Sequence, residues 1–149
     1  MPSRSRPTAP RRVLTDWTTS AGVDGTGLLA LVLGGATAEG IHLATLGYEV
    51  FVLHADDASA AAAETAGHVH HVATDPAGLP EPWHRRFDLV VAIDVPPTPD
   101  QVGPAGLLVA VSDAPLPTAD GLDEVVHDRV EDPDRPGVEL HRAVHVRLS

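Results

Sequence analysis

Residues 28–39 read LLALVLGGATAE, six apolar residues followed by a glycine pair and the start of a helical pattern. An unbroken apolar run of this length is typical of a strand that is buried on both faces of a parallel sheet. The helical pattern extends over Ala38–Leu46, and Gly47 stands where a helix would end. The stretch therefore predicts a strand, a glycine-containing loop and a helix, which together form the first unit of an α/β fold.

The same alternation continues along the chain and then changes character. Further buried strands are predicted at Val50–Leu53, Val69–Ala73, Phe87–Ile93 and Leu107–Val111. An alanine-rich helix is predicted at Ala58–Ala66, between the first two of these strands. Leu122–Val130 and Val138–Leu148 instead alternate apolar and polar residues around a turn at Asp132–Gly137, which predicts an antiparallel hairpin. We expect a mostly parallel, Rossmann-like sheet that ends in this hairpin, with helices on both faces and reduced helix content.

The chain length fits a single domain. At 149 residues the protein is long enough to bury a substantial core. Residues 1–12 are rich in Ser, Pro and Arg and are expected to form a flexible tail. Residues 13–149 are expected to form the one domain, beginning with a short helix that includes Trp17.

Charge and composition exclude several kinds of partner and site. The formal net charge is −11, and the ten basic residues, all arginine, are scattered, which disfavours binding to nucleic acid. The chain has no cysteine, which excludes disulfides and thiolate metal sites. The apolar run at Leu28–Leu33 is too short to cross a bilayer. We therefore expect a soluble cytoplasmic protein with neither a nucleic-acid nor a membrane partner.

The order of these segments resembles the class I S-adenosylmethionine-dependent methyltransferases, and among them the small thiopurine-methyltransferase-like branch. The resemblance covers about Leu28 to the C-terminus. It is carried by the spacing of several motifs and by the terminal hairpin rather than by one motif. The first motif, Leu31–Glu39, is similar to the family's strand followed by G-x-G-x-G. The others are Leu46–Val50 before the second strand, Val72–Asp75 at the third strand, and Pro82–Val91 leading into the fourth strand.

The resemblance implies a cofactor site at the carboxyl ends of the first three strands. In it, Gly34 and Gly35 would lie against the methionine end of S-adenosylmethionine, Ala36 would be a further cofactor-binding residue of the same loop, and Asp75 would meet the adenine. His54 stands where the family has an acid that accepts hydrogen bonds from both ribose hydroxyls, and Asp56 is an alternative acceptor two residues on. The same loop fits a dinucleotide site less well, because G-x-G-x-x-G is not met.

Three departures from the family pattern indicate that the site is eroded. Ala36 and Ala38 replace two of three glycines, His54 replaces the ribose acid, and Asp94–Gly106 is too short and proline-rich for the helices that shape a methyl-acceptor pocket. We expect S-adenosylmethionine binding to be weakened or lost, and the protein to serve as a binding or assembly partner or a repurposed enzyme. The alternative is an active small-molecule methyltransferase with an open pocket. No catalytic residue is assigned.

Nine histidines raise the question of a metal site. His54 ends the second strand, whereas His68, His70 and His71 lie at the start of the third, so we expect them at opposite ends of the sheet and predict no metal site. His127 is expected to pair with His141 across the terminal hairpin. The Val138–Leu148 strand is expected to offer a free edge, so that a homo-oligomer or a protein partner would bind through the hairpin.

Overall fold

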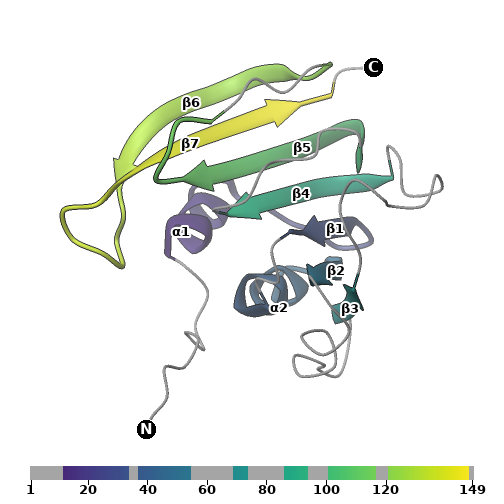
Figure 1. Cartoon of the computed structure of the whole chain (residues 1–149). Coiled ribbons are helices and arrows are strands. Elements are labelled where there is room, and N and C mark those ends of the chain that lie inside the picture. The colour runs from purple at the N-terminus through teal and green to yellow at the C-terminus, as the bar shows by residue number, and fades with distance from the viewer. Residues whose placement is uncertain are drawn as a thin grey trace, which may run out of the picture.

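The computed structural model describes residues 12–33, 37–54, 69–73, 86–93, 101–116 and 121–147. These residues form two helices packed on a seven-stranded sheet (Figure 1). The helices are α1 (Arg12–Ala21) and α2 (Thr37–Thr45), and the strands are β1 (Leu29–Val32), β2 (Glu49–His54), β3 (Val69–Ala73), β4 (Phe87–Ile93), β5 (Val102–Ser112), β6 (Asp123–Glu131) and β7 (Glu139–Val146). None of the helices in these ranges has the length and apolar character needed to span a lipid bilayer.

The strands are ordered β3-β2-β1-β4-β5-β7-β6 across the sheet. The first five in this order pair in parallel, and β7 is antiparallel to both β5 and β6. This confirms the predicted parallel sheet with an antiparallel terminal hairpin. The direction of winding reverses between β1 and β4, and in open α/β sheets ligands bind outside the carboxyl ends of the strands at such a point.

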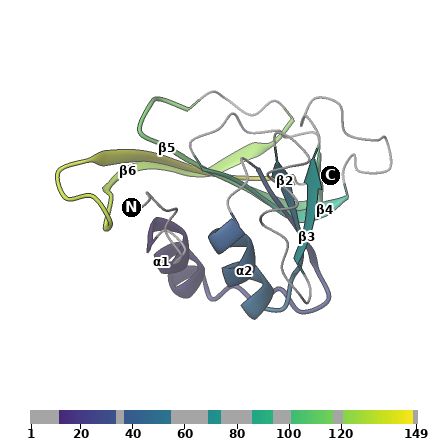
Figure 2. The ribbon, with the colours of Figure 1, turned by 60° about the horizontal axis from the view of Figure 1, so that its bottom comes forward.

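Alternate residues of the inner strands form two apolar layers, one on each face of the sheet. The first layer joins Val13 and Leu14 of α1 and Leu43 of α2 to side chains of six of the seven strands. The second includes Leu53 and Phe87 on the opposite face. Both described helices therefore cover the same face, as Figure 2 shows. The helix predicted over Ala58–Ala66 lies outside the described residues.

A glycine ends α2 and turns the chain into β2, as the sequence predicted. Gly47 has a φ of +105°, a conformation that side chains with a Cβ rarely adopt. Its N–H donates to the Ala44 carbonyl oxygen (3.1 Å), and the Tyr48 N–H donates to that of Leu43 (3.3 Å). These bonds satisfy carbonyls at the helix end that have no partner within the helix.

A polar contact joins the two helices. The Thr18 hydroxyl donates to the Thr15 carbonyl oxygen (2.9 Å), and Thr18 Oγ1 lies 2.9 Å from His42 Nε2. Since the hydroxyl hydrogen is already used, Nε2–H donates to Oγ1, which fixes the tautomer of a neutral His42. Partial burial lowers the pKa of His42 from its usual value, against the smaller raising effect of the Glu39 carboxylate.

β5 begins five residues earlier than predicted, because the sheet accommodates an irregular segment. Phe87 pairs with Val102 and Leu89 with Leu107, so the residues between Val102 and Leu107 bulge out of the ladder. In the bulge Ala105 has a φ of +62° and its N–H donates to the Arg147 carbonyl oxygen (2.7 Å). The Arg147 Nε–H donates to the Val102 carbonyl oxygen (2.6 Å). A bulge tolerates glycine and proline that would be unfavourable inside a regular strand.

The expectation that the Val138–Leu148 strand offers a free edge is wrong. β7 pairs with β5 on one side and with β6 on the other, so β6 is the outer strand at this end of the described sheet. β6 has a register shift around Val125, and its outer residues are mainly charged. Bulges and charges at an edge disfavour pairing with another chain. A partner surface on the hairpin stays a prediction, although not through pairing of β7.

Candidate functional site

The described side of the predicted cofactor site is formed by the ends of β1 and β2 and the start of α2. The Leu33 N–H donates to the Val91 carbonyl oxygen (2.9 Å), so pairing of β1 with β4 continues up to the predicted glycine loop. His54 is the last residue of β2. The other predicted cofactor-binding residues lie outside the described ranges; they are Gly34, Gly35, Ala36, Asp56 and Asp75.

His54 is buried and paired with a second histidine. Only 3% of its surface is exposed. Its Nε2 lies 2.8 Å from Nδ1 of His71, and the ring centroids are 5.0 Å apart. At this separation one nitrogen donates a hydrogen to the other. The ring at the predicted ribose position is therefore oriented toward β3.

The contact between His54 and His71 corrects the expectation that they lie at opposite ends of the sheet. β3 has five residues and pairs along the last five of β2, with Val52 opposite His71 and His54 opposite Ala73. His71 is thus two residues before the partner of His54 and on the same face, a diagonal neighbour that side chains can reach. His70 points to the other face, where it stacks on Phe51 and its Nε2 lies 2.8 Å from Glu49 Oε2.

This arrangement does not provide what a ribose requires. A carboxylate offers two oxygens that accept hydrogen bonds, so it can bind both hydroxyls of a ribose. A neutral imidazole accepts at one nitrogen and a charged one at none. His54 moreover uses Nε2 in the bond to His71. His54 therefore does not supply the two-oxygen acceptor that the predicted ribose position calls for.

The first turn of α2 contributes a buried acid that the sequence analysis did not single out. Glu39 is 6% exposed. Its carboxylate lies in the first helical turn, where the backbone N–H groups and the helix dipole favour negative charge. Gly40, the next residue, lets α2 approach β2, because a Cβ there would lie 2.7 Å from Val52 Cγ2. The one sign of Glu39 in the sequence is that an acidic residue stands near the start of a predicted helix.

The histidines of the hairpin do not form the predicted pair. The cross-strand neighbour of His127 is Ala143, and that of His141 is Arg129. His127 Nδ1 instead lies 3.0 Å from Glu124 Oε2, three residues before it on the same strand. His127 and His141 border an open hollow of about 470 Å³ together with Asp128 and Arg129. Within the described ranges, no group of three or more histidine, aspartate and glutamate side chains could hold a metal ion.

Comparison with solved structures identifies the fold. A structure described with the conversion of a disulfide bond into a thioacetal group during echinomycin biosynthesis aligns with a TM-score of 0.70 and 18% identity over 94% of this chain and 83% of that one. The 1,6-didemethyltoxoflavin-N1-methyltransferase of Burkholderia thailandensis, solved with bound 1,6-didemethyltoxoflavin and S-adenosylhomocysteine, aligns with a TM-score of 0.65 and 15% identity over 93% of this chain and 78% of that one. The [4+2]-cyclase SpnF aligns with a TM-score of 0.68 and 12% identity over 91% of this chain and 80% of that one.

The chain thus has the fold of the class I S-adenosylmethionine-dependent methyltransferases, as predicted. No protein-family model and no curated protein matches the sequence. Identities below 20% carry the fold but not the activity. The narrower likeness to the thiopurine-methyltransferase branch stays a prediction.

Proposed function

We propose that this protein uses the methyltransferase fold without methyl transfer, and that its carboxyl edge serves another ligand or a protein partner. The observation that supports the proposal is the buried His54–His71 pair at the end of β2. The fold itself is compatible with other roles, since one structure similar to this chain is a [4+2]-cyclase.

The energetic argument concerns the ribose. Replacing a two-oxygen acceptor by an imidazole that already has a partner removes about 2–4 kcal/mol of binding free energy, on the scale of charged hydrogen bonds. This corresponds to a loss of tens to hundreds of fold in affinity. The alanines predicted to replace the loop glycines, Ala36 and Ala38, would weaken binding further.

Calorimetry with S-adenosylhomocysteine tests the proposal directly. We expect no measurable heat for the wild-type protein. We expect His54→Asp to increase affinity by about ten-fold or more, because the new carboxylate restores a charged acceptor. His141→Asp makes the same chemical change on β7 and is the matched control, which should bind no better than wild type.

Two results would contradict this reasoning. A micromolar dissociation constant for the wild-type protein would make the loss of cofactor binding untenable. Equal affinities for wild type and His54→Asp would mean that the residue at the end of β2 does not control binding. Circular dichroism of each variant would establish that the sheet is intact.

An active small-molecule methyltransferase remains the second candidate. It is favoured by the similarity to a methyltransferase that was solved with S-adenosylhomocysteine and its substrate bound. In that case His54 or Asp56 would take the ribose and Asp75 the adenine. Asp75→Ala would then abolish binding of S-adenosylhomocysteine, whereas our proposal expects the substitution to have no effect on it.

A further inference from the structure

The N-terminal helix has little intrinsic stability. α1 has ten residues, no acidic residue in its first turn and no basic residue in its last. Isolated helices shorter than roughly 12–15 residues are marginal in water. The hydroxyls of Thr15, Thr18 and Thr19 all donate to backbone carbonyl oxygens of the same helix, a pattern that slightly weakens helices.

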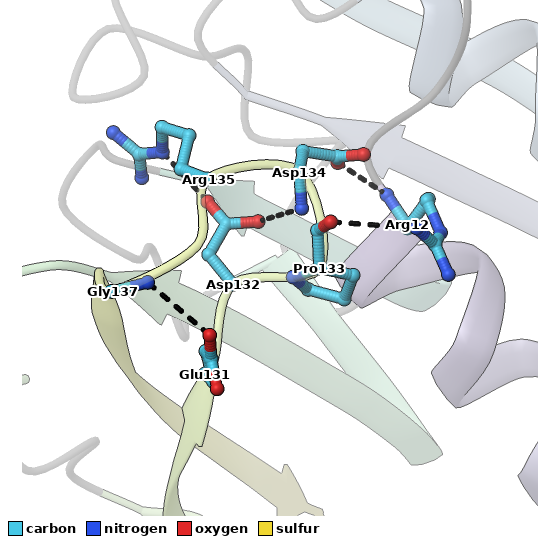
Figure 3. Close-up of polar contacts among 7 residues, drawn as sticks. All are labelled: Arg12, Glu131, Asp132, Pro133, Asp134, Arg135 and Gly137. Atoms are coloured by element: carbon cyan, nitrogen blue, oxygen red, sulfur yellow. Dashed lines mark hydrogen bonds and ion pairs between the residues drawn. The ribbon is translucent and has the colours of Figure 1, made fainter.

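Within the described residues, the acceptor at the start of α1 does not come from a neighbour in the sequence. The residue before it, Arg11, has no side-chain acceptor for the free N–H groups of the first turn. The acceptor comes from 122 residues away. The Arg12 N–H donates to Asp134 Oδ2 at 2.9 Å, and Arg12 Nη1 donates to the Pro133 carbonyl oxygen at 3.4 Å (Figure 3).

The turn that supplies this cap is held by hydrogen bonds of its own. Asp132 is 1% exposed, and its carboxylate accepts hydrogen bonds from the Asp134 N–H (2.9 Å) and from Arg135 Nε (2.7 Å). The Gly137 N–H donates to Glu131 Oε2 at 3.2 Å, which closes the base of the turn (Figure 3). Asp132 thereby directs Asp134 at the start of α1.

We propose that the β6–β7 turn (Asp132–Gly137) is a clasp that holds α1 on the sheet, and that α1 detaches as a unit when the clasp opens. The sheet stays folded, because it is held by ladders that do not include α1. Detachment uncovers the part of the first apolar layer that Val13 and Leu14 of α1 cover.

Hydrogen exchange followed by mass spectrometry of the full chain tests the clasp. In Asp134→Ala, α1 amides should exchange about five-fold faster, the factor that corresponds to the ~1 kcal/mol of a helix cap. The amides of β4 and β5 should be unaffected. Asp134→Asn should exchange like wild type, because asparagine caps as well as aspartate. Glu139→Ala, which removes an exposed contact with Arg129 on the same hairpin, is the matched control.

Trp17 provides a second readout, since it packs partly buried against the same apolar layer. In a Trp83→Phe background its emission should shift to longer wavelength in Asp134→Ala and not in Glu139→Ala. Unchanged α1 exchange in Asp134→Ala would overturn the clasp. Equal acceleration in α1, β4 and β5 would overturn the independent release of α1. An Asp134→Asn variant as fast as Asp134→Ala would overturn the assignment of Asp134 as a cap.

Discussion

Gly25 offers a sharp test of how the first unit of the fold is packed. Its N–H donates to the Leu46 carbonyl oxygen and its carbonyl oxygen accepts from the Leu28 N–H, both at 2.9 Å. The backbone is therefore held on both sides. A Cβ on Gly25 would lie 2.1 Å from Tyr48 Cδ2 and 2.4 Å from Cγ and Cε2. Tyr48 is 5% exposed, so its ring has little space into which to move.

The cost of Gly25→Ala follows from these distances. Carbon atoms in contact lie roughly 3.5–4.0 Å apart, so the ring must move by more than 1 Å or leave the core. Overpacking costs about 1–3 kcal/mol, and loss of a buried aromatic side chain about 3–5 kcal/mol. We expect a loss of ~3 kcal/mol in the free energy of unfolding. With Tyr48→Ala already present, Gly25→Ala should cost less than ~0.5 kcal/mol, because the clash is gone.

Urea denaturation of the four proteins in this cycle, followed by circular dichroism, gives the coupling free energy. Gly22→Ala is the matched control, since no atom lies within 4 Å of its Cβ position and only its φ of +65° opposes the substitution. A Gly25→Ala variant as stable as wild type would refute the packing argument. An equal loss of stability on Gly25→Ala in the presence and in the absence of the Tyr48 side chain would refute it as well.

Three further predictions concern α2 and its neighbours. Gly40→Ala should destabilise the wild-type protein, because the clash with Val52 outweighs the gain of ~1 kcal/mol in helix propensity. In a Val52→Ala background, where the clash is gone, the same substitution should stabilise the protein. Midpoints of urea denaturation test this, and a destabilising effect in both backgrounds would contradict it. Burial lowers the pKa of His42, so the unfolded chain binds more protons than the folded one, and the free energy of unfolding should fall as pH drops below about 6.5. His42→Asn should make the free energy of unfolding depend less steeply on pH in this range. An unchanged pH dependence would exclude His42 as its source. Burial, and to a lesser extent Asp88 and Asp24, raises the pKa of Tyr48, so its phenol should ionise above about pH 10 in an ultraviolet titration and stability should fall as pH rises past that value; ionisation at the ordinary pH would contradict its burial.

Strands rich in apolar residues were predictable from the sequence because burial in the sheet demands such residues. β3 and β4 have the predicted limits, Val69–Ala73 and Phe87–Ile93. The start of β5 was not predictable, because Gly103 and Pro104 are typical of loops. What holds them in the sheet is Arg147, more than forty residues later, and no local pattern indicates such a contact.

The candidate site was likewise predictable from the sequence only in part. The identity of the residue at the end of β2 was evident from the sequence, but its contact with His71 depends on the register between two strands. A register is set by packing and by the turn or helix between strands rather than by either strand alone. The cap of α1 by Asp134 was equally hidden, since a helix without a local cap gives no indication of where its acceptor comes from.

The inner position of β7 has a consequence for how the molecule is made. β6 is synthesised before β7, yet its only partner among the described strands is β7. During synthesis β6 therefore lacks this partner until β7 has also been made. Non-local pairing of this kind slows folding. A chain terminated before Glu139 would end its sheet at β5 and leave β6 as an exposed peptide open to proteases.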